Sequence, residues 1–392
     1  MQHRSFSRLE HVPQTSGNLR FESTYPWGMA SRLHGLAAAG VSVWSDQISR
    51  SMLDNGELTR MIEEDAVTGV TSNPTIFAKA IVGSEDYSAQ LDDLKAAGLS
   101  VEEIVKSLMA EDITRACDTL ANVHQANSGT DGHVSVEVSP TLAADTEATV
   151  NEARDWVKQI DRPNLLVKVP ATPEGVPAIR RLIGEGISVN ITLIFSLERY
   201  SQVIDAYLDG LEDYLAIGGD PASVASVASF FVSRFDTEVD RRLEEIGTDE
   251  ALSLRGRTAV ANARVAYGVY LDRFGSAQYT RLAAAGARPQ KPLWASTSTK
   301  NPDYDHLIYV EGLVAPGTVN TMPLETIDAY QDDGDPGPEA FTTFDIKNAH
   351  DDLDRLGQVG VNYEDVVDTL EREGVEKFIT SWQELLDGIA TG

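Results

Sequence analysis

The sequence predicts an α/β protein, a (β/α)8 TIM barrel with extra helices. From residue 41 onward, short β-branched apolar runs alternate with longer stretches of helical spacing, and eight such runs occur. Alternating units of this kind form a parallel sheet covered by helices, and a count of eight favours closure into a barrel. The alternative is an open doubly wound sheet. The chain has neither a GxGxxG nor a GxxxxGK[ST] phosphate loop, and this absence removes the main support for a dinucleotide or P-loop site.

The expected strands are short runs separated by segments that are long enough for crossover helices. The segments TEATVNEARDWVKQI, after the third run, and EGVPAIRRLIGEG, after the fourth, both have the apolar spacing of a helix. We interpret GTVNTMP (317–323) as a loop at the barrel mouth, and QDDGDPGPEA (331–340) as an acidic turn-rich loop before a helical tail. The eight expected strands are 41–44, 66–70, 133–138, 164–169, 187–193, 224–231, 292–297 and 306–313.

The first 28 residues are expected to lie outside the barrel. They are polar, contain three arginines and lack the apolar segment of a secretion signal. We interpret residues 1–28 as an extension, disordered or left over from cloning. A more natural beginning is at Met29, and residues 29–392 are predicted to form a single catalytic barrel domain.

The composition narrows the range of partners. The chain has 61 acidic and 32 basic residues and a formal net charge of −29, which would repel phosphate backbones and anionic lipid. Nucleic acid and membrane surfaces are therefore not expected as partners. Cys117 is the only cysteine, so no intramolecular disulfide can form and a reducing, cytoplasmic location is expected. Both a monomer and a homodimer remain open.

Polar residues occur near the ends of four expected strands, where β-strand packing alone would favour apolar ones. They include Lys168 in NLLVKVPATPE, although burying an ammonium group costs several kcal/mol, in rough terms, unless it is paired or neutralised. Side chains near the carboxyl ends of barrel strands point toward the mouth, where barrel enzymes act. The polar residues are Asp46, Glu137, Lys168, Asn190 and Thr192.

Each of these residues also has an ordinary structural explanation. Asp46 could cap the following helix, and Glu137 with Lys168 could form a structural ion pair. Asn190 and Thr192, taken alone, could be ordinary strand residues. A lysine and two carboxylates on different strand ends, all directed at one volume, instead favour a catalytic cluster.

The chemistry of such a cluster follows from its groups. A desolvated lysine can react as a neutral amine and form a Schiff base with a carbonyl. Expelling the hydroxyl needs a proton shuttle, for which Glu137 is suited, with Thr192 orienting a water. A second carboxylate, Asp46, can take the proton from a hydroxyl on the β-carbon and so promote carbon–carbon cleavage. This is aldol chemistry without a metal or cofactor, and no HExxH or paired His/Cys motif suggests a metal site.

Six segments resemble, in this order, the motifs of transaldolases, which are class I, Schiff-base enzymes on a (β/α)8 barrel. The similarity runs from about residue 33 to the C-terminus and is closest to a long bacterial branch of the family. It implies that Lys168 is the Schiff-base residue, that Glu137 and Thr192 hold the catalytic water, and that Asp46 acts at the cleaved bond. The six segments are GVSVWSDQISR, GVTSNPTIF, VSVEVSPTLAADTEATV, LLVKVPATPEG, ISVNITLIFS and ASFFVSRFD.

The same resemblance implies a set of substrate-binding residues. Thr71 and Asn73 in the TSNP motif, together with Asn190, match contacts to substrate hydroxyls. Arg234, preceded by Ser229, matches the phosphate-binding arginine, and Ser298 and Lys300 follow the seventh strand. Lysine stands at position 300 where the family often has arginine, so bidentate phosphate binding would be lost there. Surface ion pairs are the alternative role for the two basic residues.

The implied function is transaldolase activity in the pentose phosphate pathway. A dihydroxyacetone unit would pass from sedoheptulose 7-phosphate or fructose 6-phosphate to glyceraldehyde 3-phosphate or erythrose 4-phosphate. The expected partners are therefore sugar phosphates. Two alternatives are a fructose-6-phosphate aldolase-type lyase, which would release free dihydroxyacetone, and a sugar-phosphate-binding barrel without turnover.

Overall fold

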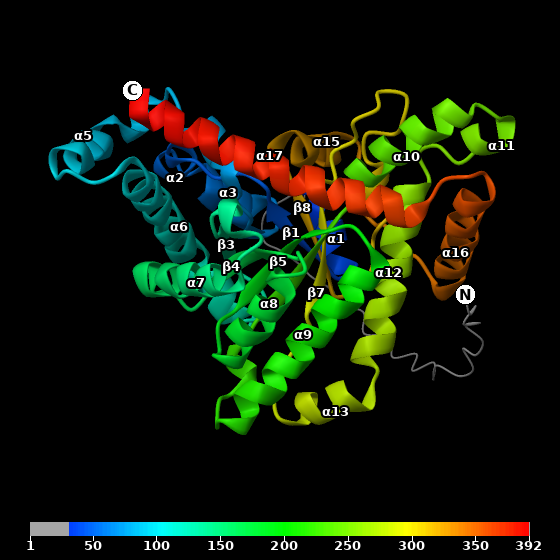
Figure 1. Cartoon of the computed structure of the whole chain (residues 1–392), viewed down its shortest axis with the longest axis horizontal. Coiled ribbons are helices and arrows are strands. Elements are labelled where there is room, and N and C mark those ends of the chain that lie inside the picture. Colours follow the sequence, from blue (N-terminus) through cyan, green and yellow to red (C-terminus); the bar gives the residue numbers. More distant parts are fainter. Residues whose placement is uncertain (1–30, 392) are drawn as a thin grey trace. The chain divides into compact units, whose positions relative to one another are not determined.

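Eight parallel strands close into a barrel in which each strand pairs with its neighbours in sequence and β8 pairs with β1 (Figure 1). The computed structural model describes residues 31–391. The predicted barrel is therefore confirmed, and the open sheet is excluded. The strands are β1 (Val41–Ser45), β2 (Val67–Val70), β3 (Val134–Glu137), β4 (Leu165–Pro170), β5 (Val189–Ile194), β6 (Ser226–Phe231), β7 (Lys291–Ala295) and β8 (Thr318–Met322).

Helices connect successive strands and cover the outside of the barrel (Figure 1). The predicted crossovers after the third and fourth strands are present as α7 and α8. Two further helices, α16 and α17, follow the last barrel unit. The helices are α1 (Leu33–Ala38), α2 (Arg50–Asp54), α3 (Glu57–Glu64), α4 (Pro74–Ile81), α5 (Ser88–Ala96), α6 (Val101–Ala126), α7 (Thr146–Ile160), α8 (Gly175–Gly184), α9 (Leu197–Ala216), α10 (Ser233–Ile246), α11 (Asp249–Leu252), α12 (Thr258–Phe274), α13 (Ala277–Ala284), α14 (Ile308–Glu311), α15 (Leu324–Asp333), α16 (Thr343–Gln358) and α17 (Tyr363–Thr391).

Five of the eight barrel strands are buried along their whole length. Every residue of β3, β4, β5, β6 and β8 is buried, because one face of a barrel strand packs into the interior and the other against the helices. Such strands consist mainly of Val, Ile, Leu and Phe. A polar side chain on them must find partners inside the protein or have a function.

The prediction for the eighth strand was wrong. Residues 306–313 contain the short helix α14, and the eighth strand is β8, within the segment that we had interpreted as a loop. Tyr309, Val310 and Leu313 are buried, and their spacing fits one face of a helix better than a strand.

The true eighth strand is polar, and a prediction based on runs of apolar residues therefore missed it. Its residues Thr318, Asn320 and Thr321 are buried and form hydrogen bonds within the protein. All five residues of β8 are in register with β1, from Val41 opposite Thr318 to Ser45 opposite Met322. Backbone pairing on both sides therefore compensates for its low apolar content.

The last helix, α17, packs along the barrel and against several of its helices. It contacts α4, α6, α10 and β5 (Figure 1). Its buried residues recur at intervals of three or four, from Val366 through Leu370, Gly374 and Phe378 to Leu385, as expected for a helix with one apolar face. The predicted helical tail is thus confirmed.

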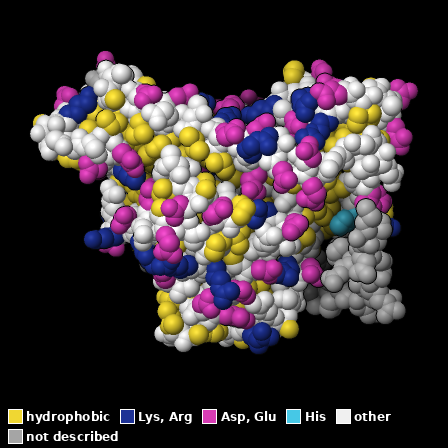
Figure 2. All heavy atoms as spheres, viewed as in Figure 1, with side chains coloured by type: hydrophobic (Ala, Val, Ile, Leu, Met, Phe, Trp, Pro, Cys, Tyr) yellow, Lys and Arg dark blue, Asp and Glu magenta, His cyan; other side chains and the backbone are white. Residues whose placement is uncertain are grey.

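The remaining features are the single cysteine, the apolar content of the helices, the surface charge and the first 28 residues. Cys117 is buried. Among residues 31–391, no helix is both long and apolar enough to cross a bilayer. Acidic and basic side chains mix over the face shown in Figure 2. The predicted extension at residues 1–28 lies outside the described residues.

Candidate active site

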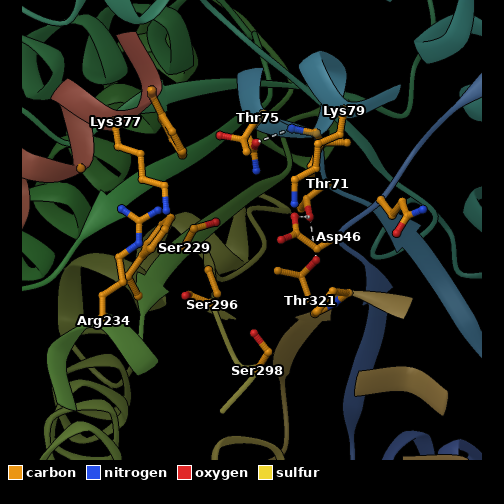
Figure 3. A pocket seen from close by; sticks show the side chains of 18 of the residues that line it. Asp46, Thr71, Thr75, Lys79, Ser229, Arg234, Ser296, Ser298, Thr321 and Lys377 are labelled. Atoms are coloured by element: carbon orange, nitrogen blue, oxygen red, sulfur yellow. Dashed lines mark hydrogen bonds between the residues drawn. The ribbon is translucent and has the colours of Figure 1, made fainter. Parts of the chain in front are cut away.

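A cavity of about 1110 Å³ opens at the carboxyl ends of the barrel strands (Figure 3). Lys168 lies in its wall, although the side chain is almost completely buried. Eight of the eleven predicted site residues line this cavity: Asp46, Thr71, Asn73, Lys168, Ser229, Arg234, Ser298 and Lys300. The other three, Glu137, Asn190 and Thr192, are buried on the strands on either side of Lys168.

Strand register brings Glu137, Lys168 and Asn190 side by side. Glu137 is paired with Lys168 between β3 and β4, and Lys168 with Asn190 between β4 and β5. The Nζ atom of Lys168 lies 3.7 Å from Glu137 Oε2 and donates a 3.2 Å hydrogen bond to the backbone oxygen of Ser72. The amine is therefore held by one carbonyl next to a carboxylate, and it keeps donor capacity for a substrate.

Glu137 has the properties of a proton-transfer group at neutral pH. Burial raises its pKa from 4.5 to about 7, and the positive charge of Lys168 partly offsets this effect. Its Oε2 atom has no hydrogen-bond partner among the described residues, and the same holds for Thr192 Oγ1. Two buried oxygens without protein partners, both next to the lysine strand, suit a shared water.

Asn190 is held inside the barrel and does not line the cavity. Its side-chain Nδ2 donates to Ser135 Oγ at 2.9 Å, and its Oδ1 accepts from Ser229 Oγ at 2.7 Å. Ser229 itself reaches the cavity. In this structure Asn190 therefore supports a cavity-lining serine, and a direct contact with a substrate hydroxyl would require exchange of one of these hydrogen bonds.

The strand that carries Asn190 and Thr192 has an irregularity at the mouth. The register between β5 and β6 shifts between Ile191 and Ile194, and Leu193 has a left-handed backbone conformation with φ of 59°. Such a conformation is costly for a branched aliphatic residue. Bulges of this kind are frequent next to active sites because they redirect side chains.

Asp46 lies on the opposite side of the cavity from Arg234 and Lys377, on the side of Lys79, and is oriented by Thr71 (Figure 3). Thr71 Oγ1 donates to Asp46 Oδ1 at 2.7 Å and lies 2.6 Å from Thr321 Oγ1 on β8. The alternative role as a helix cap is wrong, because Ser49 caps α2 by accepting from Met52. The carboxylate is thus directed into the cavity.

Asn73 combines a structural role with exposure to the cavity. Its Oδ1 accepts from the backbone N–H of Ile76 at 3.0 Å, which caps the start of α4. The Nδ2 group remains available as a donor in the cavity wall. A direct contact with a substrate hydroxyl therefore remains a prediction that the local geometry allows.

The cationic side of the cavity contains Arg234, Lys300 and Lys377. Arg234 stacks against the rings of Phe231 and Phe378 at 5.3 and 5.9 Å, and burial lowers the pKa of its guanidinium group. Lys300 donates to Ser298 Oγ at 2.6 Å.

The surface ion pairs that were the alternative role for Arg234 and Lys300 are not found. Within the described range neither residue forms an ion pair with a carboxylate. Their charges are therefore free to bind an anion.

Some residues of the site were missed by the sequence analysis. Ser72 acts through its backbone oxygen, which no side-chain pattern reveals. Thr321 belongs to the strand that was interpreted as a loop. Lys377 lies on the C-terminal helix, far along the chain from the other site residues, and no motif in the sequence marks it. Among residues 31–391 no group of three His, Cys, Asp or Glu side chains is arranged to hold a metal ion.

Comparison with known proteins agrees with this geometry. Residues 43–389 match the family model described as transaldolase/fructose-6-phosphate aldolase. The chain belongs to this family. The transaldolase of Thermobifida fusca is 56% identical over 363 residues, which cover 92% of this chain and 98% of that protein. A transaldolase of Acidothermus cellulolyticus is 54% identical over 357 residues, covering 91% of this chain and 95% of the relative.

A third relative, transaldolase 1 of Streptomyces coelicolor, is 52% identical over 360 residues that cover 92% of this chain and 94% of its own length. These findings confirm the predicted family, its bacterial affinity and the predicted function as a transaldolase enzyme. The roles of individual residues stay predictions.

Proposed function

We propose that this chain transfers a dihydroxyacetone unit between sugar phosphates through a Schiff base on Lys168. The observation that carries the proposal is the position of the Lys168 amine. It lies in the wall of the cavity, 3.7 Å from Glu137, and the same cavity is lined by Asp46 and by the cations Arg234 and Lys300. The donors would be ketose phosphates such as fructose 6-phosphate or sedoheptulose 7-phosphate.

The first step joins the amine to the ketone carbon. The nitrogen of Lys168 attacks the carbonyl, and the resulting carbinolamine loses its hydroxyl as water to form an iminium ion. Glu137, whose pKa is raised to about 7, supplies the proton for the departing hydroxyl and takes a proton from water during hydrolysis. The unpartnered oxygens of Glu137 and Thr192 support a water in this role.

The second step breaks a carbon–carbon bond. Asp46 removes the proton from the hydroxyl on the β-carbon, the bond between the α- and β-carbons breaks, and its electron pair passes to the iminium. An aldose phosphate leaves, and an enamine remains on Lys168. The hydrogen bond from Thr71 to Asp46 supports this role because it holds the carboxylate toward the cavity. Attack of the enamine on an acceptor aldehyde reverses these steps.

The cationic side accounts for the phosphate group of the substrate. Arg234, Ser298 and Lys300 line the cavity, and Arg234 lies on the side away from Asp46 (Figure 3). A phosphorylated sugar can then extend from Lys168 toward these residues. In a chain with a formal net charge of −29, such a local concentration of positive charge is needed to attract an anionic substrate.

Release of dihydroxyacetone without transfer is the closest alternative, because the family model includes fructose-6-phosphate aldolases. The relatives described above are named transaldolases, which favours transfer. An assay with fructose 6-phosphate and erythrose 4-phosphate separates the two reactions. Transfer gives sedoheptulose 7-phosphate, whereas a lyase gives free dihydroxyacetone at the same rate with or without the acceptor.

Borohydride trapping tests the roles of Lys168 and Asp46 together. After incubation with fructose 6-phosphate, we expect a reduced three-carbon adduct on Lys168 in the wild type, identified by peptide mass. Asp46→Asn should form the iminium but cleave it slowly, so the trapped adduct should keep all six carbons and the phosphate. Lys168→Met is the control that should give no adduct. An adduct on another residue, or a three-carbon adduct in Asp46→Asn at the wild-type rate, would contradict the proposed roles.

A further inference from the structure

The C-terminal helix α17, which lies outside the eight barrel units, contributes the side chain of Lys377 to the cavity. Lys377 lines the cavity together with Arg234 and Lys300. Figure 3 shows Lys377 and Arg234 on the same side, with Ser229, Ser296 and Ser298 beside them and Asp46 on the other. We propose that Lys377 binds the phosphate group of the substrate, so that α17 forms one wall of the phosphate site. This inference rests on the proposed function and deepens it.

The position of Lys377 is determined by well-packed residues on both sides of it along α17. A Cβ atom on Gly374 would lie 3.1 Å from Leu193 Cδ2 and 3.5 Å from the Phe195 ring, so the helix touches the end of β5 closely there. Ser381 Oγ lies 2.8 Å from Thr75 Oγ1 on α4. Residues three and four apart lie on the same side of a helix, which places Lys377 between these two anchors and above the mouth.

The next residue connects α17 directly to the phosphate-binding arginine. Phe378 is buried, and its ring lies 5.9 Å from the guanidinium carbon of Arg234. Arg234 is thus stacked between an aromatic ring of the barrel, Phe231, and one of α17. Phe378 follows Lys377 directly in the chain. The packing of Phe378 against Arg234 therefore positions both Arg234 and Lys377.

Lys377 belongs to a group of cations in the cavity wall, to which Glu373 and Glu376 of the same helix also contribute carboxylates. Among the described residues no carboxylate forms an ion pair with Lys377, whereas exposed arginines such as Arg180, Arg181 and Arg241 on other helices each have one. The charged groups that shift the pKa of Lys377 are cations. Arg234 is the largest cause that lowers the pKa of Lys377, and burial, Lys300 and Lys79 lower it further. Like charges held together in an acidic protein are stabilised when an anion lies between them.

The proposal also accounts for Lys300 at a position where bidentate binding is lost. A lysine binds phosphate as a point charge with freely rotating donors. Two such lysines, Lys300 from the loop after β7 and Lys377 from α17, can contact different phosphate oxygens while Arg234 contacts a third. Phosphate recognition would then depend on the docking of α17 and not only on the barrel loops.

The test compares Lys377→Ala, Lys377→Met and Lys377→Arg with the wild type and with Lys158→Ala. Lys158 is an exposed lysine on α7, away from the cavity, and serves as the matched control. Three quantities are measured: competitive inhibition by inorganic phosphate, the KM for fructose 6-phosphate, and kcat/KM for unphosphorylated fructose.

We expect Lys377→Ala and Lys377→Met to raise the inhibition constant of phosphate and the KM for fructose 6-phosphate about tenfold, the range of one charge-assisted hydrogen bond. Lys377→Arg should keep most of the affinity, and kcat/KM for fructose should not change in any variant. Wild-type phosphate inhibition in Lys377→Ala would overturn the proposal. An equal loss with fructose would overturn it too, because that would indicate a general disturbance of the site.

A binding measurement separates this inference from the proposed function. Inorganic phosphate should raise the Tm of the wild type and of Lys158→Ala but have a much smaller effect on Lys377→Ala, and no turnover is involved. Trapping of unphosphorylated dihydroxyacetone on Lys168 by borohydride should be equal in all these proteins. Loss of trapping in the wild type would contradict the Schiff-base mechanism, whereas an equal rise of Tm in Lys377→Ala would contradict only the role of Lys377.

Discussion

At the residue scale, Glu137 illustrates how the burial of one carboxyl group changes both its pKa and its contribution to stability. It is fully buried on β3 and its Oε2 atom has no hydrogen-bond partner within residues 31–391. Burial disfavours the charged carboxylate, and Lys168 at 3.7 Å restores only part of this loss. A pKa of about 7 suits a group that must both donate and accept a proton near neutral pH.

The pKa of Glu137 leads to a prediction about pH and stability. It is raised in the folded state from 4.5 to about 7, so the associated stability is present below pH 4.5 and is lost as the pH rises through 7. Glu137→Gln removes this titration. Its free energy of unfolding relative to the wild type should therefore be higher at pH 8 than at pH 5, by on the order of 3 kcal/mol. Urea unfolding at both pH values measures the difference.

The same variant should lower kcat by roughly 10²–10⁴-fold, since the amide cannot transfer protons. Glu63→Gln, at an exposed position on α3, is the control and should change neither quantity. If the relative stability of Glu137→Gln were the same at both pH values, the raised pKa of Glu137 would be refuted.

At the scale of elements, α17 is the part that completes the mouth of the barrel. Its contact with β5 depends on a close approach at Gly374, where a side chain would meet Leu193. Leu193 already has a left-handed backbone, so it has little freedom to move away. The docking of this helix therefore depends on the absence of a side chain at Gly374 and also at Gly388, where a Cβ would lie 2.6 Å from Val82.

Gly374→Val tests this dependence. The added methyl groups should overpack the contact with Leu193 and lower the free energy of unfolding by about 1–3 kcal/mol. The KM for fructose 6-phosphate should rise, because Lys377 and Phe378 lie on the next turn. Gly357→Val on α16, where an added Cβ meets nothing within 4 Å, is the matched control and should be neutral. Unchanged Tm and KM in Gly374→Val would argue against a tight contact.

At the scale of the whole molecule, a strongly acidic protein has a cluster of cations, Arg234, Lys300 and Lys377, in the wall of its cavity. The formal net charge is −29, and the self-repulsion of such a charge opposes the compact state. The cations around the cavity have the opposite effect on an anionic substrate. Salt screens the repulsion among the acidic residues, which raises stability. It also screens the attraction between the cavity cations and the substrate, which weakens binding.

Raising the NaCl concentration from about 0.02 to 0.5 M shortens the Debye length from roughly 20 Å to below 5 Å. We expect the Tm to rise, because repulsion among the acidic residues is screened, and the KM for fructose 6-phosphate to rise several-fold. Unphosphorylated fructose is the control, and its kcat/KM should be nearly independent of salt. A KM for fructose 6-phosphate that is equally insensitive to salt would show that the mouth does not attract its substrate electrostatically.

The sequence by itself determined the barrel and indicated most of the residues that we propose for catalysis. Asp46, Glu137, Lys168 and Thr192 could be found because local strand patterns make a polar residue conspicuous among Val, Leu and Ile, and parity places it in the interior. Membership of the transaldolase family followed from the order of these motifs.

The tertiary structure decided what depends on contacts between segments that are distant in the chain. Only the structure identified β8, because this polar strand is stabilised by backbone pairing with β1 and β7 and not by the burial of apolar side chains. Only the structure placed the Ser72 carbonyl against Lys168, Thr321 beside Thr71, and Lys377 beside Arg234. Local periodicity reports which face of an element is buried, but it carries no information about which distant segment covers that face.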